Sequence, residues 1–245
     1  MKRLIGAALF LSAALLACNL GPTPTSEVRF FNAVPDTIGV KVFFGQDLMT
    51  TAPNGVDFRA AFPGNTTYRT LNAGTLTYSL CPADLLDCPS EVKNRTVVLG
   101  GAKKTSVILV GTKASNDNTG VDARPLEIVS LSNDTVAPAA GKSRLRVVHA
   151  AAVVAAKAVD LFITAPDTDL TTITTPAQVN YKGTYDYRDL NAGTYRIRAT
   201  EPGVVSPVLV DSDNLTLEAG KTYTAIITNP DAGNANKGVT LLTDK

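Results

Sequence analysis

The sequence predicts an all-β protein, with two tandem Ig-like antiparallel β-sandwich domains after an N-terminal signal peptide. A nine-residue segment occurs twice with few changes, which indicates two copies of one unit. Short runs rich in Thr, Val, Tyr, Phe and Ile are separated by Gly-containing turns, and beyond the N-terminus no amphipathic helical period persists. A chain of 245 residues with 44% hydrophobic side chains is long enough to form two cores.

The N-terminus has the pattern of an export signal. Lys2 and Arg3 precede an apolar run over residues 4–16. Its thirteen residues, at about 1.5 Å each, fall short of a bilayer core of roughly 30 Å, so the run predicts a signal peptide and not a spanning helix. The end of the run resembles the bacterial lipobox. This resemblance implies cleavage between Ala17 and Cys18 and acylation of the Cys18 thiol; the alternative is an ordinary secretory signal with a chance Cys.

The lipobox sets the first two segments of the chain and its expected location. Residues 1–17 form the signal peptide, and residues 18–25 form the lipidated Cys and a Pro/Thr tether. The seven residues after Cys18 reach at most about 25 Å. Each buried CH₂ of an acyl chain contributes roughly 0.8 kcal/mol to the free energy of membrane binding, so two or three chains attach the protein permanently. We therefore expect a bacterial envelope protein, anchored to its membrane by acyl chains on the extracytoplasmic side, periplasmic or at the cell surface.

The two remaining cysteines are Cys81 and Cys88. Export places them in an oxidising compartment, which favours a disulfide between them. In the chain-entropy model, a disulfide that closes so short a loop stabilises the folded state by about 2.5 kcal/mol. The alternative, a redox or metal site, lacks both a C-x₂-C spacing and a nearby His.

Internal repetition sets the remaining boundaries. Residues 68–76 and 187–195 match at seven of nine positions. Neighbouring segments agree in the same order: 28–33 with 145–150, 39–44 with 158–163, and 99–109 with 217–227. The sequence thus predicts a first sandwich over 26–133, a linker over 134–142 and a second sandwich over 143–245.

Each copy is expected to contain about seven short strands, which is typical of an Ig-like sandwich, with a barrel as second choice. Alternating or nearly alternating patterns predict strands at 75–80, 194–199 and 215–217. Continuous apolar runs predict buried strands at 107–110 and 225–227.

Four segments of the second copy resemble a known family. They cover 144–150, 159–162, 190–195 and 217–224, and they are similar to the bacterial domain of unknown function 4397 family, with the first half of the chain as a more divergent copy. The resemblance implies a β-sandwich of secreted and cell-surface proteins with no established enzymatic activity. The family often has His-Ala-Ser-Pro-Asp after its first strand. Here the second copy keeps His149 and the first keeps Asp36, with Asn32 in place of the His.

Charge and residue types exclude several function classes. With 23 basic and 22 acidic side chains, the chain offers no electrostatic footprint for nucleic acid. His149 is the single histidine, so we expect a hydrogen-bonded structural imidazole and no His-based metal or catalytic site. No catalytic residue, cofactor or metal ion is expected.

Acidic residues gather in two segments. Asp167 with Asp169, and Asp211 with Asp213 and Asn214, carry oxygen ligands that suit Ca²⁺. Asp and Asn also cap their own backbone in turns, and we favour that interpretation.

Three tyrosines form a candidate ligand face: Tyr181, Tyr185 and Tyr187. In a regular strand they share one side, where they would stack on sugar rings or form part of a core. The leading hypothesis is a non-enzymatic binding, adhesion or envelope-organising module whose partner is an envelope polysaccharide or protein. The alternatives are a structural spacer or surface-layer component without a discrete ligand and, remotely, a polysaccharide-active enzyme using Asp160 with Asp167.

Overall fold

The computed structural model describes residues 22–45, 47–50, 54–84, 95–113, 124–133, 136–152, 157–230 and 237–245. In these ranges the chain forms β-strands and one 3-10 helix, Leu170–Thr172, so the predicted all-β class is confirmed. No helix of the described residues is long and apolar enough to cross a membrane. Ala17, Cys18 and Cys88 lie outside the described residues, as do the signal peptide and the start of the tether.

The strands before residue 134 form two sheets. The inner sheet has the order β4-β1-β8-β9, with β5 also paired to β1; the outer sheet has the order β3-β2-β6-β7. The inner strands are β1 (Thr25–Asn32), β4 (Ala61–Phe62), β5 (Arg69–Asn72), β8 (Lys104–Val110) and β9 (Glu127–Ser132). The outer strands are β2 (Val40–Phe44), β3 (Asp47–Leu48), β6 (Gly74–Pro82) and β7 (Arg95–Leu99).

The strands after residue 141 repeat this arrangement. The inner sheet has the order β13-β10-β17-β18, and the outer sheet has the order β12-β11-β14-β15, with β16 also paired to β14. The inner strands are β10 (Lys142–His149), β13 (Thr184–Asn191), β17 (Thr222–Ile227) and β18 (Val239–Thr243). The outer strands are β11 (Ala158–Thr164), β12 (Ala177–Asn180), β14 (Gly193–Thr200), β15 (Val208–Asp211) and β16 (Leu215–Leu217).

The strands predicted from the sequence are present, as parts of β6, β8, β14, β16 and β17. One pair in each sandwich is parallel: β1 with β8, and β10 with β17. The other pairs between the described strands are antiparallel.

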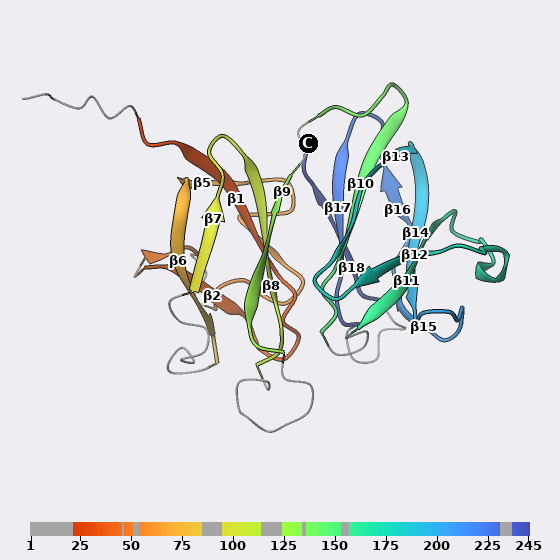
Figure 1. Cartoon of the computed structure of the whole chain (residues 1–245), viewed down its shortest axis with the longest axis horizontal. Helices are drawn as coiled ribbons and strands as arrows, with labels where there is room; N and C mark the ends of the chain where they lie inside the picture. Colours follow the sequence, from red (N-terminus) through yellow and green to blue (C-terminus); the bar gives the residue numbers. More distant parts are fainter. Residues whose placement is uncertain are drawn as a thin grey trace, which may run out of the picture.

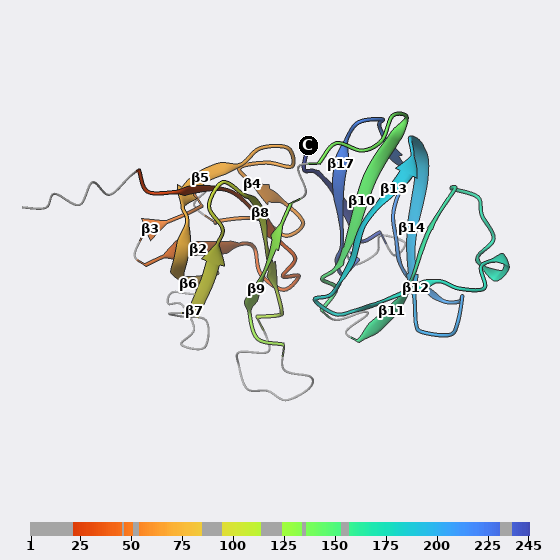
Figure 2. The ribbon, with the colours of Figure 1, turned by 45° about the horizontal axis from the view of Figure 1, so that its top comes forward.

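The four sheets stack in series, so the two inner sheets face each other across the middle of the molecule (Figure 1; Figure 2). One core fills each sandwich, and a third apolar cluster joins the two inner sheets. Alternation along each inner strand supplies both sides: on β1, Val28 and Phe30 enter the first core, while Phe31 enters the third cluster. The inner strands are therefore covered on both faces, which is why almost every residue of β8 and β17 is buried.

Candidate binding site

Two arginines occupy equivalent positions at the junction, the contact between the two inner sheets. Arg29 lies on β1 beside Ser106 of β8, and Arg146 lies on β10 beside Thr224 of β17. Both side chains are buried, and both donate a hydrogen bond to that neighbouring hydroxyl, at 2.9 Å. The alternation that directs their neighbours into the cores directs these arginines toward the other sandwich.

Each arginine binds the C-terminal end of the last strand of the opposite sandwich. Arg29 donates to the carbonyl oxygen of Thr243 at 2.8 Å and to Oδ1 of Asp244 at 2.6 Å. Arg146 donates to the carbonyl oxygen of Ser132 at 2.9 Å and to Oδ1 of Asn133 at 2.7 Å. The contacts are reciprocal, as in an isologous dimer interface, but both halves belong to one chain.

Two equivalent tyrosines complete this network. The Tyr187 hydroxyl donates to Oδ2 of Asp244 at 2.7 Å, and the Arg146 guanidinium lies 4.6 Å from the centre of its ring. The Tyr68 hydroxyl accepts from Nδ2 of Asn133 at 2.8 Å, and Arg29 lies 4.8 Å from its ring centre. Burial raises the pKa of Tyr68 to about 12 and raises the pKa of Tyr187 as well. Both phenols therefore stay protonated at neutral pH.

The apolar part of the junction lies beside these polar groups. Its buried members are Phe31, Ala33, Ile108, Val110, Val148, Ala150, Ile226 and Leu242. They come from both inner sheets, so their burial depends on the contact between the sandwiches. An exposed ion pair, Lys182 with Glu127 at 2.8 Å, also spans the junction.

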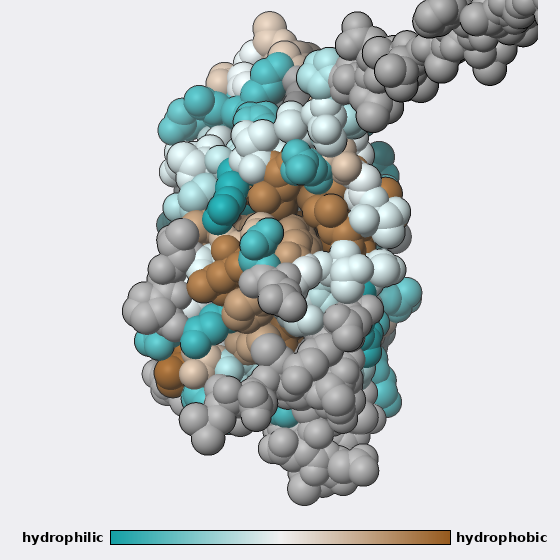
Figure 3. All heavy atoms as spheres, turned by 90° about the vertical axis from the view of Figure 1, so that its left-hand side faces the viewer, coloured by the Kyte–Doolittle hydropathy of each residue, from teal (hydrophilic) through white to brown (hydrophobic). Residues whose placement is uncertain are grey.

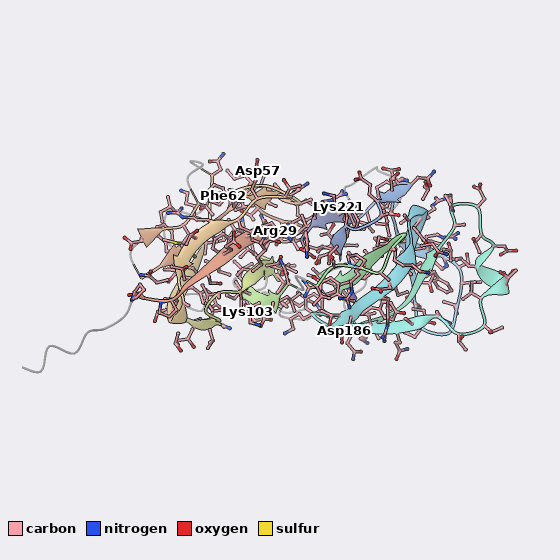
Figure 4. The ribbon with its side chains drawn as sticks, turned by 90° about the horizontal axis from the view of Figure 1, so that it is seen from above. Arg29, Asp57, Phe62, Lys103, Asp186 and Lys221 are labelled. Carbon is pink, nitrogen blue, oxygen red and sulfur yellow. The ribbon has the colours of Figure 1, made fainter. Side chains whose placement is uncertain are left out.

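A groove of about 550 Å³ opens at one side of the junction. The first sandwich contributes Lys103 from the turn before β8 and Lys104 from the start of β8, and the second contributes Asp186, Tyr187 and the buried Arg146. Figure 4 shows Lys103 and Asp186 on the same side of the molecule, on either side of the junction. The groove exists because the junction fixes two sheets side by side, and its basic groups suit a polar or anionic ligand.

The candidate tyrosine face is not formed. Tyr185 packs against the second core, Tyr187 belongs to the junction network, and Tyr181 packs against the junction cluster. The cause is a β-bulge: Leu145 pairs with Arg188 but Val147 pairs with Tyr185, so β13 has one extra residue there. Because the extra residue reverses the alternation, Tyr185 and Tyr187 point to opposite sides, and the expectation of a shared face was wrong.

His149 has a structural role at the end of β10. It is fully buried, its Nδ1 accepts a hydrogen bond from the Ala151 N–H at 3.3 Å, and its ring meets that of Tyr181 edge-on at 5.9 Å. At the equivalent end of β1, Oδ1 of Asn32 accepts from the Val34 N–H at 2.8 Å. An amide and an imidazole thus fix the same turn, as the structural interpretation of His149 predicted.

The acidic residues serve the fold. Asp169 caps the 3-10 helix by accepting from the Thr171 N–H at 2.9 Å, and that bond lowers its pKa. Asp211 accepts two hydrogen bonds from Arg196, and Asp213 pairs with Lys237. Among the described residues no three His, Cys, Asp or Glu side chains are grouped as metal ligands.

Two further candidate pairs come from the sequence: Asp160 with Asp167 as a carboxylate pair, and Cys81 with Cys88 as a disulfide. Asp160 is buried and accepts from the Gly203 N–H at 2.7 Å, whereas Asp167 is exposed, so their environments differ. Cys81 is buried near the end of β6, and its expected partner Cys88 lies outside the described residues. The disulfide therefore stays a prediction.

Sequence reasoning missed the junction arginines. A signal was present: Arg29 and Arg146 interrupt apolar runs at matching positions of the two copies. A charge in the middle of a strand that is otherwise buried indicates a partner from another element. The sequence did not show that this partner is the other copy.

Comparison with known proteins agrees with this repeated fold. The model of the family described as Domain of unknown function (DUF4397) matches residues 26–162 and 152–245. The chain belongs to the DUF4397 family. The first match extends into β11, so the two matches overlap over residues 152–162, inside the second sandwich.

Solved structures resemble this DUF4397 protein only distantly. The Bacillus anthracis TIE protein is 11% identical with a TM-score of 0.26, over 84% of this chain; the chain spans about a third (34%) of that protein. A family 26 carbohydrate-binding module of Eubacterium rectale Amy13K, in complex with maltoheptaose, is 10% identical over 90% and 97% of the two chains, with a TM-score of 0.24. A candidate cell adhesion protein of Bacteroides ovatus is 9% identical over 92% and 97%, with a TM-score of 0.24. At these TM-scores the likenesses carry no functional argument. The comparison with curated proteins gives no match.

Proposed function

We propose that this DUF4397 protein is an exported lipoprotein of a bacterial envelope, attached through Cys18, that acts as a non-enzymatic binding or organising module. The apolar run over 4–16 and its closing Cys support export and anchoring. Residues 26–133 and 143–245 would be its two functional domains, joined by the linker 134–142. Its expected partner is an envelope polysaccharide or protein.

The observation that carries this proposal is the reciprocal junction. Two sandwiches on a free linker would present two independent surfaces. Here Arg29 and Arg146 each donate hydrogen bonds to the last strand of the opposite sandwich, which fixes the two together. Because the two sandwiches are already held in one body, a ligand that contacts both of them binds with a smaller loss of conformational entropy. The groove between Lys103 and Tyr187 is a surface of this kind, since it draws its lining from each sandwich.

The test is co-sedimentation of oxidised chain, residues 26–245, with purified cell-wall polymer and separately with stripped envelope membranes. We expect saturable pelleting with one of the two fractions. Lys103→Glu with Lys104→Glu should lower the bound fraction about tenfold, because the charges of both lysines at the groove are reversed. Lys221→Glu is the matched control, since Lys221 occupies the position of Lys103 in the second copy and does not line this groove.

Two results would contradict the proposal. Absence of pelleting with both fractions would favour the spacer without a discrete ligand. Equal loss in the Lys221→Glu control would show that net charge, and not the groove, governs binding.

A further inference from the structure

The outer sheets of the two sandwiches have the same fold but different surfaces. On the first, alternation along β6 turns Leu76 and Tyr78 into the core and leaves Thr75 and Thr77 exposed. Val98, opposite Thr75 on β7, is 69% exposed. Phe43 and Leu48 pair across β2 and β3, and Leu48 is also exposed. The surface that these side chains form, named here the outer face, is therefore apolar or hydroxylic, apart from Lys41, which alternates with core residues on β2.

The equivalent surface of the second sandwich is charged. Arg196 and Arg198 stand on β14 at the positions of Thr77 and Ser79 on β6. Arg196 forms an ion pair with Asp211 at 2.6 Å, and Asp160 occupies the position of Lys41. Desolvating this surface would expose several charges to an apolar medium, at a cost that the outer face avoids.

The tether enters the molecule beside the outer face. The carbonyl oxygen of Pro24 accepts a hydrogen bond from the Ala73 N–H at 2.8 Å, and Thr25 pairs with Asn72. Asn72 in turn lines a hollow of about 390 Å³ at the end of the sandwich, whose apolar lining comes from Phe44, Met49, Leu71 and Leu76. Figure 3 shows hydrophobic side chains gathered in and around this hollowed face.

The second sandwich carries a larger side chain at the equivalent position. Tyr195 takes the place of Leu76, packs against the second core and donates to the carbonyl oxygen of Asn191, the counterpart of Asn72, at 2.9 Å. The hollow of Phe44, Met49, Leu71 and Leu76 lies in the copy that follows the tether.

We infer that the outer face of the first sandwich lies against the bilayer that anchors the chain. This inference rests on the proposed acylation of Cys18. Pro24 is the sixth residue after Cys18, so an anchored chain keeps this end within about 21 Å of the membrane. Apolar and hydroxyl side chains tolerate the headgroup region, and the outward Lys41 suits lipid phosphates. The second sandwich, with its charged surface, then faces away from the membrane.

The chain has no Trp, so one introduced Trp reports its own surroundings. Thr75→Trp and Thr194→Trp place it at equivalent exposed positions of the two sandwiches. The acylated full-length protein is reconstituted into phosphatidylcholine vesicles, with and without brominated acyl chains. We expect bromine to quench Thr75→Trp about threefold more than Thr194→Trp, because interfacial groups sit roughly 5–10 Å into the headgroup region.

A second variant separates bilayer contact from simple tethering. Thr77→Glu with Val98→Glu, in the Thr75→Trp background, adds charge at two exposed positions and should reduce quenching to the Thr194→Trp level. Equal quenching of the two probes, or none of either, would overturn the inference. The latter is the outcome if a protein partner covers this face. Acylation is read separately from the mass of the N-terminal peptide, so failure of the anchor is distinguished from failure of the bilayer contact.

Discussion

At the scale of residues, the two halves of the junction differ because only one of them contains a carboxylate. Arg29 meets the carboxylate of Asp244, whereas Arg146 meets the amide of Asn133 at the equivalent position. Arg29 and Asp244 are both completely buried. An unpaired buried charge costs more than an unpaired amide, so the two halves of the junction should respond differently to the same substitution.

Arg29→Met should lower the free energy of unfolding by about 3–5 kcal/mol, because the Asp244 carboxylate then stays buried without its partner. Arg146→Met is the matched variant and should cost about 1–3 kcal/mol, since it leaves the neutral oxygens of Ser132 and Asn133 without a donor. Urea unfolding of the two variants beside the wild-type chain measures the difference. Equal losses would show that Asp244 is not held as a charged group by Arg29.

At the scale of elements, backbone irregularities decide which side chains reach the junction. The bulge in β13 puts Tyr187 on the junction side and Tyr185 on the core side, which a regular strand would not do. A second constraint lies where β2 begins: Gly55 has φ +74°, and an added Cβ would stand 2.2 Å from the carbonyl oxygen of Val40. The close approach permits the hydrogen bonds between Val40 and Val56.

Gly55→Ala should therefore destabilise the first sandwich by about 2 kcal/mol or more, from the clash added to the strain of a left-handed residue. Gly45→Ala isolates the clash, because Gly45 has φ +61° but no atom within 4 Å of an added Cβ. It should cost only about 1 kcal/mol. Thermal unfolding of both variants tests the expectation, and similar shifts in Tm would contradict it.

At the scale of the whole molecule, the junction makes the two sandwiches dependent on each other. Its centre contains two protonated phenols, Tyr68 and Tyr187, beside a buried carboxylate. Burial raises the pKa of Tyr68 to about 12, against about 10 in an unfolded chain. Above pH 10 the unfolded chain releases protons that the folded chain keeps, so stability decreases as pH rises.

We expect the urea midpoint to be constant between about pH 8 and pH 9.5 and to fall progressively from pH 10 toward pH 12. Tyr68→Phe removes one of the ionising groups and should make this fall shallower, although it lowers stability at neutral pH. The tyrosinate absorbance of the folded protein, followed over the same range, gives the ionisation directly. A midpoint that stays constant to pH 12 would contradict the burial of these phenols.

The sequence by itself determined the fold class, the duplication and the positions of five strands, because alternating and continuous apolar patterns depend on local geometry. The apolar run 107–110 even required a strand covered on both faces. Only the tertiary structure decided that the other copy provides this cover, that β1 and β8 are parallel, and that Tyr185 and Tyr187 point apart. These features depend on contacts between distant segments and on one inserted backbone residue, and neither leaves a periodic pattern in the sequence. The partners of Arg29 and Arg146 follow the same rule, since a buried charge shows that it needs a partner but not where that partner lies.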